Sequence, residues 1–512
     1  MTRDTPMASS RDSAKRVSSR RRAMGFRLAA VLVAPVLLAL GEMTFVLLDW
    51  GRPTRCDDPF VGFSAIHPLF VRSADGARYE TARSRYRCFR PQSFPAKKGA
   101  DEVRIFALGG STVQGRPYAV ETSFTTWLEM NLRLAEPART WRVVNCGGIS
   151  YASYRLVPIL REVLGRGADM VILYTGHNEF LEDREYADLR DRPRWIAWPC
   201  EQLARMRTFN LLRAGWVRLA GESVEAPGPA SVLKADVDAI LDYQGGLAKY
   251  HRDEPWRRGV IEHFGYNLRR MVRMSRDAGV AVLLVNPACN LRDCPPFKSQ
   301  HRDGLTGTER RRWEALCRQA ADCSGADAHR AVRLLRQAVA IDGRHAGLHY
   351  RLAKELDAMG DVLAARESYL RAKEQDVCPL RIVEPMNAAI LEIARQAGTA
   401  LVDVRKLIAE RSDRGIPGEA CLSDHVHLRI ATHRLVADAM IDELARRGVV
   451  RPRAGWRQQQ EPAAQKHLAS LGYEYFAAGV RRLEAVQGWA AGRATLVPPD
   501  EPSTRPKRKA NP

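Results

Sequence analysis

The chain has 512 residues and a formal net charge of +21. This length exceeds what one hydrophobic core usually organises, so we expect a main domain with an anchor, an insertion or a second module. The charge could indicate nucleic-acid binding. Much of the excess, however, lies at the two ends, where residues 1–27 hold eight basic residues against two acidic ones and residues 505–509 hold four basic residues. Such tails are not a folded basic face, and we expect no nucleic-acid partner.

An apolar run from Leu28 to Leu48 follows the N-terminal basic residues. Its length suits a crossing of ~30 Å of hydrocarbon. A cleaved signal peptide is the alternative, but the length of the run and the lack of a small-x-small site before Asp49 favour a retained anchor. By the positive-inside rule, residues 1–27 then form a cytoplasmic tail and residues 28–50 cross the membrane. The rest of this single-pass protein is expected outside the cytoplasm, in the periplasm or cell envelope.

Ten cysteines are many for a cytosolic enzyme and few for a disulfide scaffold. Cys289 with Cys294, and Cys56 with Cys88, could form bridges in an oxidising compartment. Burial of the same residues as free thiols is an equally good interpretation. The chain has no CxxC pair, so we expect no zinc or redox cluster.

Short apolar segments alternate with helical patterns after a lead-in, residues 51–100, that is rich in proline and charge and predicts little regular structure. The predicted strands are residues 104–108, 141–145, 170–174, 280–286 and 400–404. This alternation favours a parallel sheet covered by helices on both faces. Ligands of such sheets bind beyond the carboxyl ends of the strands. The main domain is expected over residues 101–300 and 379–448, with a helical insertion at about 180–260 and a C-terminal helix and disordered tail over 449–512.

A second insertion, residues 305–378, shows a 34-residue period. Its best copy, from Ala346 to Pro379, resembles a tetratricopeptide repeat. The matching small and large positions are Ala353, Leu356, Ala365, Tyr369 and Ala372. An ordinary helical hairpin with an alanine-rich interface is the alternative. The repeat implies a docking surface for a protein partner.

Three short motifs carry chemically competent residues. Ser111 follows Gly109 and Gly110 at the predicted end of a strand, where a serine hydroxyl is exposed, although the same turn could cradle a phosphate. Asn178 lies in the segment 176–179 that follows the third strand, where its amide could donate to an oxyanion or merely close a turn.

The third motif places Asp424 and His427 three residues apart, so that the carboxylate can orient the imidazole. A metal site made by Asp424, His425 and His427 is the alternative, but no other cluster supplies the remaining ligands. We therefore expect no metal.

These motifs, in this order, resemble those of the SGNH (GDSL-type) hydrolase superfamily over roughly residues 101–180 and 280–445. The resemblance implies a flavodoxin-like three-layer α/β fold and a catalytic triad of Ser111, Asp424 and His427. It also implies an oxyanion hole formed by Ser111, Asn178 and an amide of the second motif, residues 145–150. That amide belongs to Ser150, or to Gly148 if the turn is shifted.

The resemblance departs from the common pattern at Gly110, where aspartate is frequent, and at Glu179, also usually aspartate. The implied activity is hydrolysis of an ester, such as an O-acetyl group on an envelope polysaccharide or a lipid ester, with no cofactor. Acyl transfer to a sugar hydroxyl by the same triad is one alternative. A non-catalytic scaffold acting through the repeats is another. Arg381 could bind substrate, although an exposed arginine is the simpler interpretation.

Overall fold

The computed structural model describes residues 60–186 and 231–490 except residue 244, together with residues 38–50 except 46 and 49, residue 58, and residues 206–212 except 210. The chain divides into two units, one made by Met1–Gly62 with Glu185–Val232 and the other by Phe63–Arg184 with Leu233–Pro512. The strands β1 (Val61–Phe63) and β8 (Ser231–Leu233) occur where the chain passes between the units. The second unit contains the sheet and all the candidate site residues.

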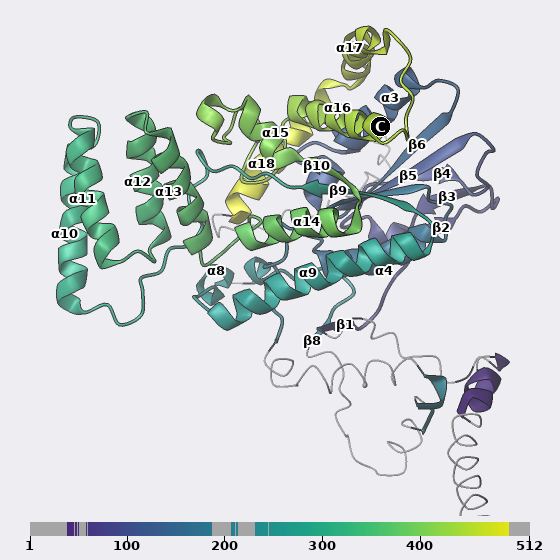
Figure 1. Ribbon diagram of the computed structural model, residues 1–512, viewed down its shortest axis with the longest axis horizontal. Coiled ribbons are helices and arrows are strands. Elements are labelled where there is room, and N and C mark those ends of the chain that lie inside the picture. The colour runs from purple at the N-terminus through teal and green to yellow at the C-terminus, as the bar shows by residue number, and fades with distance from the viewer. Residues whose placement is uncertain are drawn as a thin grey trace, which may run out of the picture. The chain divides into compact units, whose positions relative to one another are not determined.

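A five-stranded parallel sheet forms the centre of this second unit (Figure 1). Its strands are β5 (Glu102–Gly109), β6 (Thr140–Gly147), β7 (Met170–Tyr174), β9 (Ala281–Asn286) and β10 (Ala400–Asp403). They are the five strands predicted from the sequence, and their spatial order is β6-β5-β7-β9-β10. Numbered along the chain this is 2-1-3-4-5, the strand order of flavodoxin. The mixed α/β class and the parallel sheet are therefore confirmed.

Helices cover both faces of the sheet, because its strands are apolar on both sides (Figure 1). One face carries α3 (Phe124–Ala135) and α16 (Ile430–Arg446), and the other carries α4 (Ser153–Leu164), α9 (Glu254–Asp277) and α14 (Glu384–Ala397). The core between the sheet and the first layer contains Phe124, Trp127 and Trp141, each at most 2% exposed. The remaining short helices of the domain are α2 (Ser111–Gln114), η2 (Val120–Thr122), η3 (Ile240–Asp242), α8 (Gly246–Lys249), α15 (Val404–Arg411) and η4 (Asp413–Gly415).

The lead-in is more ordered than predicted. It contains η1 (Arg83–Arg85) and a small antiparallel sheet of β2 (Phe70–Arg72), β3 (Arg78–Thr81) and β4 (Ser93–Pro95). Phe94 is fully buried and packs edge-on against Phe70 and against Phe106 of β5. These aromatic contacts to the main sheet stabilise strands of three or four residues, which are too short for a periodic signal in the sequence.

Residues 305–378 form two helical hairpins. The helices are α10 (Gly307–Cys323), α11 (Ala328–Ile341), α12 (Ala346–Ala358) and α13 (Val362–Gln375). All five residues that carry the repeat resemblance are buried, with Ala353 and Ala365 fully so. Small buried residues let paired helices approach closely. Whether the hairpins are tetratricopeptide repeats stays a prediction.

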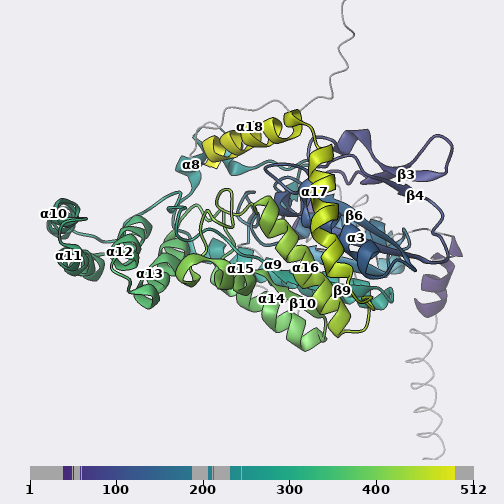
Figure 2. The ribbon, with the colours of Figure 1, turned by 90° about the horizontal axis from the view of Figure 1, so that it is seen from above.

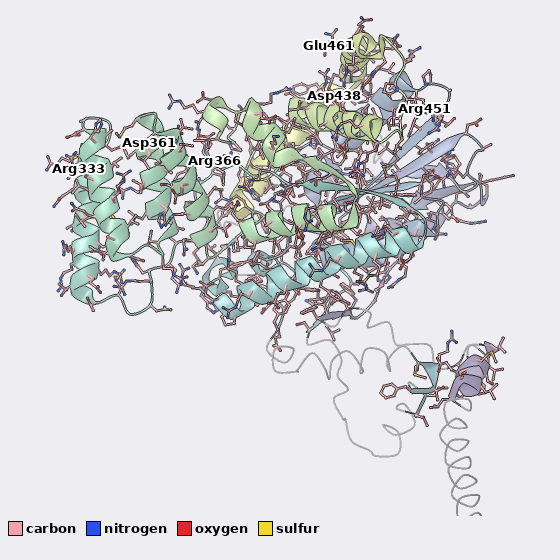
Figure 3. All side chains as sticks on the ribbon, in the orientation of Figure 1. Arg333, Asp361, Arg366, Asp438, Arg451 and Glu461 are labelled. Carbon is pink, nitrogen blue, oxygen red and sulfur yellow. The ribbon has the colours of Figure 1, made fainter. Side chains whose placement is uncertain are left out.

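The C-terminal segment contains η5 (Trp456–Gln459) and two helices, α17 (Gln460–Ser470) and α18 (Tyr473–Ala490). The sequence predicts one helix within residues 449–512, but the structure has two, because the chain turns at Leu471 and Gly472 and the two helices run in different directions (Figure 2). Asp438 and Glu461, labelled in Figure 3, join α16 and α17 through hydrogen bonds and an ion pair with Gln460 and Arg434. The predicted disordered tail lies beyond residue 490, outside the described residues.

Most of the predicted membrane anchor also lies outside the described residues. Residues 38–45 are helical, and the Glu42 carboxylate accepts hydrogen bonds from the backbone N–H groups of Arg207 and Thr208 at 2.6 and 2.9 Å. Within the part of the chain that the structure covers, no helix has the length and apolarity needed to span a bilayer. The helical insertion predicted at about 180–260 is described only in part, and the described residues of 231–253 contain one short strand and two single helical turns.

Candidate active site

Ser111 is the first residue of α2, directly after β5 and the two glycines. Neither glycine has room for a side chain. A Cβ on Gly109 would lie 2.1 Å from the carbonyl oxygen of Tyr174, and one on Gly110 would lie 2.4 Å from Nδ2 of Asn178. A side chain on Gly110 would therefore displace the Asn178 amide from its present position. The tight turn leaves the Ser111 hydroxyl partly exposed at the carboxyl end of the sheet.

Asp424, His427 and Ser111 form a continuous hydrogen-bonded chain. His427 Nε2 is 2.7 Å from Ser111 Oγ, and His427 Nδ1 is 2.6 Å from Asp424 Oδ2. The other carboxylate oxygen of Asp424 accepts the backbone N–H of Val426 and of His427 at 2.9 and 2.8 Å. The loop thus fixes the carboxylate, which in turn fixes the imidazole beside the hydroxyl. This is the geometry of a serine nucleophile with a histidine base and an aspartate that orients it.

The charge state of this chain follows from its surroundings. Burial opposes ionisation of Asp424, but the neighbouring His427 and His425 and the hydrogen bonds from His427 outweigh it and hold the Asp424 pKa well below its usual range. Burial lowers the pKa of His425 to about 4 and that of His177 to about 3. Both side chains are therefore neutral near pH 7. The ring of His425 lies 6.0 Å from that of His427 without taking part in the hydrogen-bonded chain.

The residues of the metal alternative, Asp424, His425 and His427, are not arranged as a set of metal ligands. His425 Nδ1 is 3.5 Å from Asp424 Oδ1, whereas the His427 nitrogen that faces Asp424 already contacts the second carboxylate oxygen. Throughout the described ranges, no group of three histidine, cysteine or acidic side chains is placed to hold a metal ion.

Three candidate donors keep a free N–H in the loops after β5, β6 and β7. Among the hydrogen bonds of residues 60–186, where the structure describes every residue, none uses the backbone N–H of Ser111 or of Ser150. Asn178 Nδ2 donates to the carbonyl oxygen of Tyr151 at 3.0 Å, which leaves its second hydrogen available. These are the groups that an oxyanion hole requires.

The structure corrects one predicted donor. The N–H of Gly148 donates to the carbonyl oxygen of Gly109 at 3.0 Å, so it is occupied by the link between β5 and β6. A Cβ on Gly148 would also lie 2.6 Å from the Tyr151 ring, so the glycine serves close packing. Of the two amides considered for the second motif, Ser150 alone keeps an unengaged N–H.

Ser150 has a backbone φ of 61°, one of two positive values among the described residues other than glycine. Such a conformation costs a serine roughly 1 kcal/mol or more and is concentrated at functional sites. The sequence gives no signal for it, because serine is not a usual residue for this region of backbone space.

Glu179 connects the second and third motifs, a role that the sequence did not reveal. Its carboxylate is fully buried and accepts the N–H and the hydroxyl of Ser153 at 2.8 and 2.9 Å. Ser153 begins α4, three residues after Ser150. Together with the Asn178–Tyr151 hydrogen bond, this contact clamps the loop after β7 to the loop after β6. The clamp holds two of the candidate oxyanion donors in place.

Arg381 is neither exposed nor a free cation. Its side chain is 2% exposed and donates to the carbonyl oxygens of Asn290 and Cys294 at 2.9 and 2.8 Å. It therefore holds loops together. Cys289 and Cys294 are both free thiols, so the bridge considered between them is absent. Cys88 is likewise a free buried thiol, and Cys56 lies outside the described residues.

No family model matches the sequence, and no curated protein matches it. Solved structures show a distant similarity. A lipolytic protein of the G-D-S-L family from Desulfitobacterium hafniense is 10% identical, with a TM-score of 0.30 over 67% of this chain and 99% of that one. The acetylxylan esterase Axe2 from Geobacillus stearothermophilus is 12% identical, with a TM-score of 0.30 over 68% and 95%. An alpha/beta hydrolase from the Lake Arreo metagenome is 13% identical, with a TM-score of 0.30 over 68% and 97%. Similarity at this level carries no inference about function.

Proposed function

We propose that the protein is a serine esterase of the SGNH superfamily, with Ser111 as nucleophile. The observation that carries this proposal is the chain from Ser111 Oγ through His427 to Asp424, with separations of 2.7 and 2.6 Å. The free amides of Ser111 and Ser150 and the Asn178 side chain add the electrostatic half of the site.

The mechanism is acyl transfer through the serine. His427 Nε2 takes the hydroxyl proton as Ser111 Oγ bonds to the ester carbonyl carbon, and the carbonyl oxygen becomes an oxyanion among the three donors. His427 then protonates the leaving alcohol as its bond to carbon breaks. Water, deprotonated by the same imidazole, releases the acid and restores Ser111. One donor such as Asn178 stabilises the transition state by about 3 kcal/mol.

Candidate substrates are O-acetyl groups of an envelope polysaccharide and lipid esters. We test the reaction with the full chain and p-nitrophenyl acetate, butyrate and octanoate, comparing wild type with Ser111→Ala. Turnover that the substitution abolishes supports the esterase, and the preferred acyl length separates a deacetylase from a lipase. If folded wild type neither turns over nor reacts with a fluorophosphonate, the proposal fails.

The membrane location is part of the same proposal. The apolar run at 28–50 with its basic N-terminal flank supports a single-pass anchor, with the esterase domain outside the cytoplasm. Alkaline carbonate should leave the full chain in the membrane pellet and extract a variant that lacks residues 28–50. Protease added from outside should digest the esterase domain in cells whose outer envelope layer has been permeabilised. Extraction of the full chain by carbonate would refute the anchor.

We also propose that the helical hairpins dock a protein partner, because paired helices with buried alanines stack as repeat modules do. Arg333 and Arg366 are exposed on α11 and α13 (Figure 3). A photo-crosslinking residue at either position should capture a protein partner in cells. Lack of any adduct at both positions would count against docking by the hairpins.

A further inference from the structure

A polar cavity of about 550 Å³ lies where the helical hairpins join the α/β domain, away from the residues of the triad. The first turn of α9 forms one wall, and Arg344, between α11 and α12, forms another with the C-terminal end of α13. In Figure 1 this end of α9 is on the side of the sheet from which the hairpins extend. The cavity contains more charged side chains than a packing defect would.

Two ion pairs cross the junction and account for half of the cavity's arginines. Arg344 pairs with Glu254 at 2.5 Å, and Arg257 pairs with Glu374 at 2.5 Å. Each pair joins α9 to the hairpins. These four side chains therefore neutralise one another.

The two other acidic side chains of the lining are engaged elsewhere. Asp253 accepts the backbone N–H of Trp256 as the N-cap of α9. Asp376 is buried and accepts the backbone N–H groups of Phe297, Lys298 and Cys378 at 2.8 to 3.0 Å. Neither carboxylate forms an ion pair with an arginine of the lining.

Two guanidinium groups of the lining form no ion pair within the described part of the chain. Arg252 donates to neutral oxygens alone, the Gln375 side chain and the carbonyls of Arg344 and Gln300, at 2.9 to 3.4 Å. Its Nε is buried with no partner among the described residues. Arg258 is exposed at the cavity and has neither an ion pair nor a hydrogen bond within the described part of the chain. A partly buried guanidinium that forms no ion pair, next to an exposed one, favours an anionic ligand.

We propose that this cavity binds an oxyanion group, a carboxylate or a phosphate, through Arg252 and Arg258. The planar guanidinium fork of Arg258 matches both groups in geometry, and Arg252 adds its charge. Phe180 and Trp256 also line the cavity, with ring centroids 5.5 Å apart, and offer an apolar surface to the body of the ligand. Phe180 is two residues from Asn178. A bound ligand therefore touches the hairpins and the loop that carries the oxyanion donor.

The test is calorimetric titration of the full chain with glucuronate, glucose and inorganic phosphate at constant ionic strength. We expect saturable binding of glucuronate or phosphate and none of glucose, and the probe that binds identifies carboxylate or phosphate as the preferred group. Arg258→Ala should weaken that binding about tenfold or more, because a charge-assisted hydrogen bond is lost. Arg258→Lys should weaken it less.

Arg312→Ala is the matched control, because Arg312 is an exposed arginine of α10 outside the cavity. It should leave binding unchanged. Ser111→Ala should also bind normally, so the esterase proposal can fail without affecting this one. Absence of saturable binding by both anions, or equal binding by wild type and Arg258→Ala, would overturn the site.

Discussion

Glu179 offers the sharpest test of how the candidate oxyanion hole is held. Its carboxylate accepts two hydrogen bonds from Ser153, and Asn178 precedes it in the chain. Glu179→Ala leaves the buried Ser153 N–H without a partner, which costs about 1–3 kcal/mol of stability. It also frees the loop that aims Asn178. If the donor loses its position, most of the ~3 kcal/mol that such a donor supplies is lost, or about a hundredfold in kcat.

Glu179→Gln separates hydrogen bonding from charge. The amide oxygen can accept the Ser153 N–H, and the amide nitrogen can donate to the Ser153 hydroxyl, so both contacts survive. Burial raises the pKa of Glu179, so loss of the ionised form should be tolerated. We therefore expect kcat within a fewfold of wild type for Glu179→Gln and a large loss for Glu179→Ala.

The assay is steady-state hydrolysis of p-nitrophenyl acetate, with thermal unfolding to confirm that each variant is folded. A positioning role lowers kcat and leaves KM nearly unchanged, because the oxyanion forms in the transition state alone. Ser153→Ala, which keeps the N–H contact, should lose less activity than Glu179→Ala. Wild-type kcat in a folded Glu179→Ala protein would refute the clamp. Equal losses for Gln and Ala would show that the charge matters instead.

Three further experiments have defined outcomes. Ser150→Gly should keep activity, since the N–H remains, and should raise the free energy of unfolding by about 1 kcal/mol by relieving the positive φ; a loss of stability would contradict this. Burial lowers the pKa of His433 to about 3, so the unfolded chain binds a proton near pH 6.5 that the folded chain does not. Stability should fall as pH drops from about 6.5 towards 3, and in His433→Gln the slope should be shallower by up to about 1.4 kcal/mol per pH unit. Mass spectrometry after alkylation in denaturant should find Cys289 and Cys294 modified without reduction, whereas a 289–294 bridge would leave both unmodified.

The sheet could be predicted because its strands are buried on both faces and so appear as unbroken apolar runs. The lead-in strands could not, since each is three or four residues long and depends on Phe94 packing against Phe106. The break between α17 and α18 was also missed, because the helical pattern continues directly on both sides of Leu471 and Gly472. Such local exceptions depend on contacts between segments distant in sequence.

The same distinction applies to the site. Asp424 and His427 are neighbours within one loop, so their spacing alone predicted the 2.6 Å contact. The sequence could not show whether Gly148 or Ser150 supplies the free backbone N–H. The Gly148 N–H is engaged because it donates to the carbonyl oxygen of Gly109 in β5, a contact between two strands. Arg381 was misjudged for the same reason. Its exposure is set by loops around Asn290 and Cys294 that lie far from it in the chain.

The strand order explains why these residues meet. The strand β5 lies between β6 and β7. The chain runs from β5 to β6 on one side and then crosses from β6 to β7 on the other side of β5. In such parallel sheets, ligands bind beyond the carboxyl ends of the strands at the point where the order reverses. Ser111, Ser150 and Asn178 each follow one of those strands. A hydroxyl, a backbone amide at positive φ and a side-chain amide therefore come from three separate loops at the same edge of the sheet. The Glu179–Ser153 clamp is what such an arrangement requires, since no single element holds any two of the donors together.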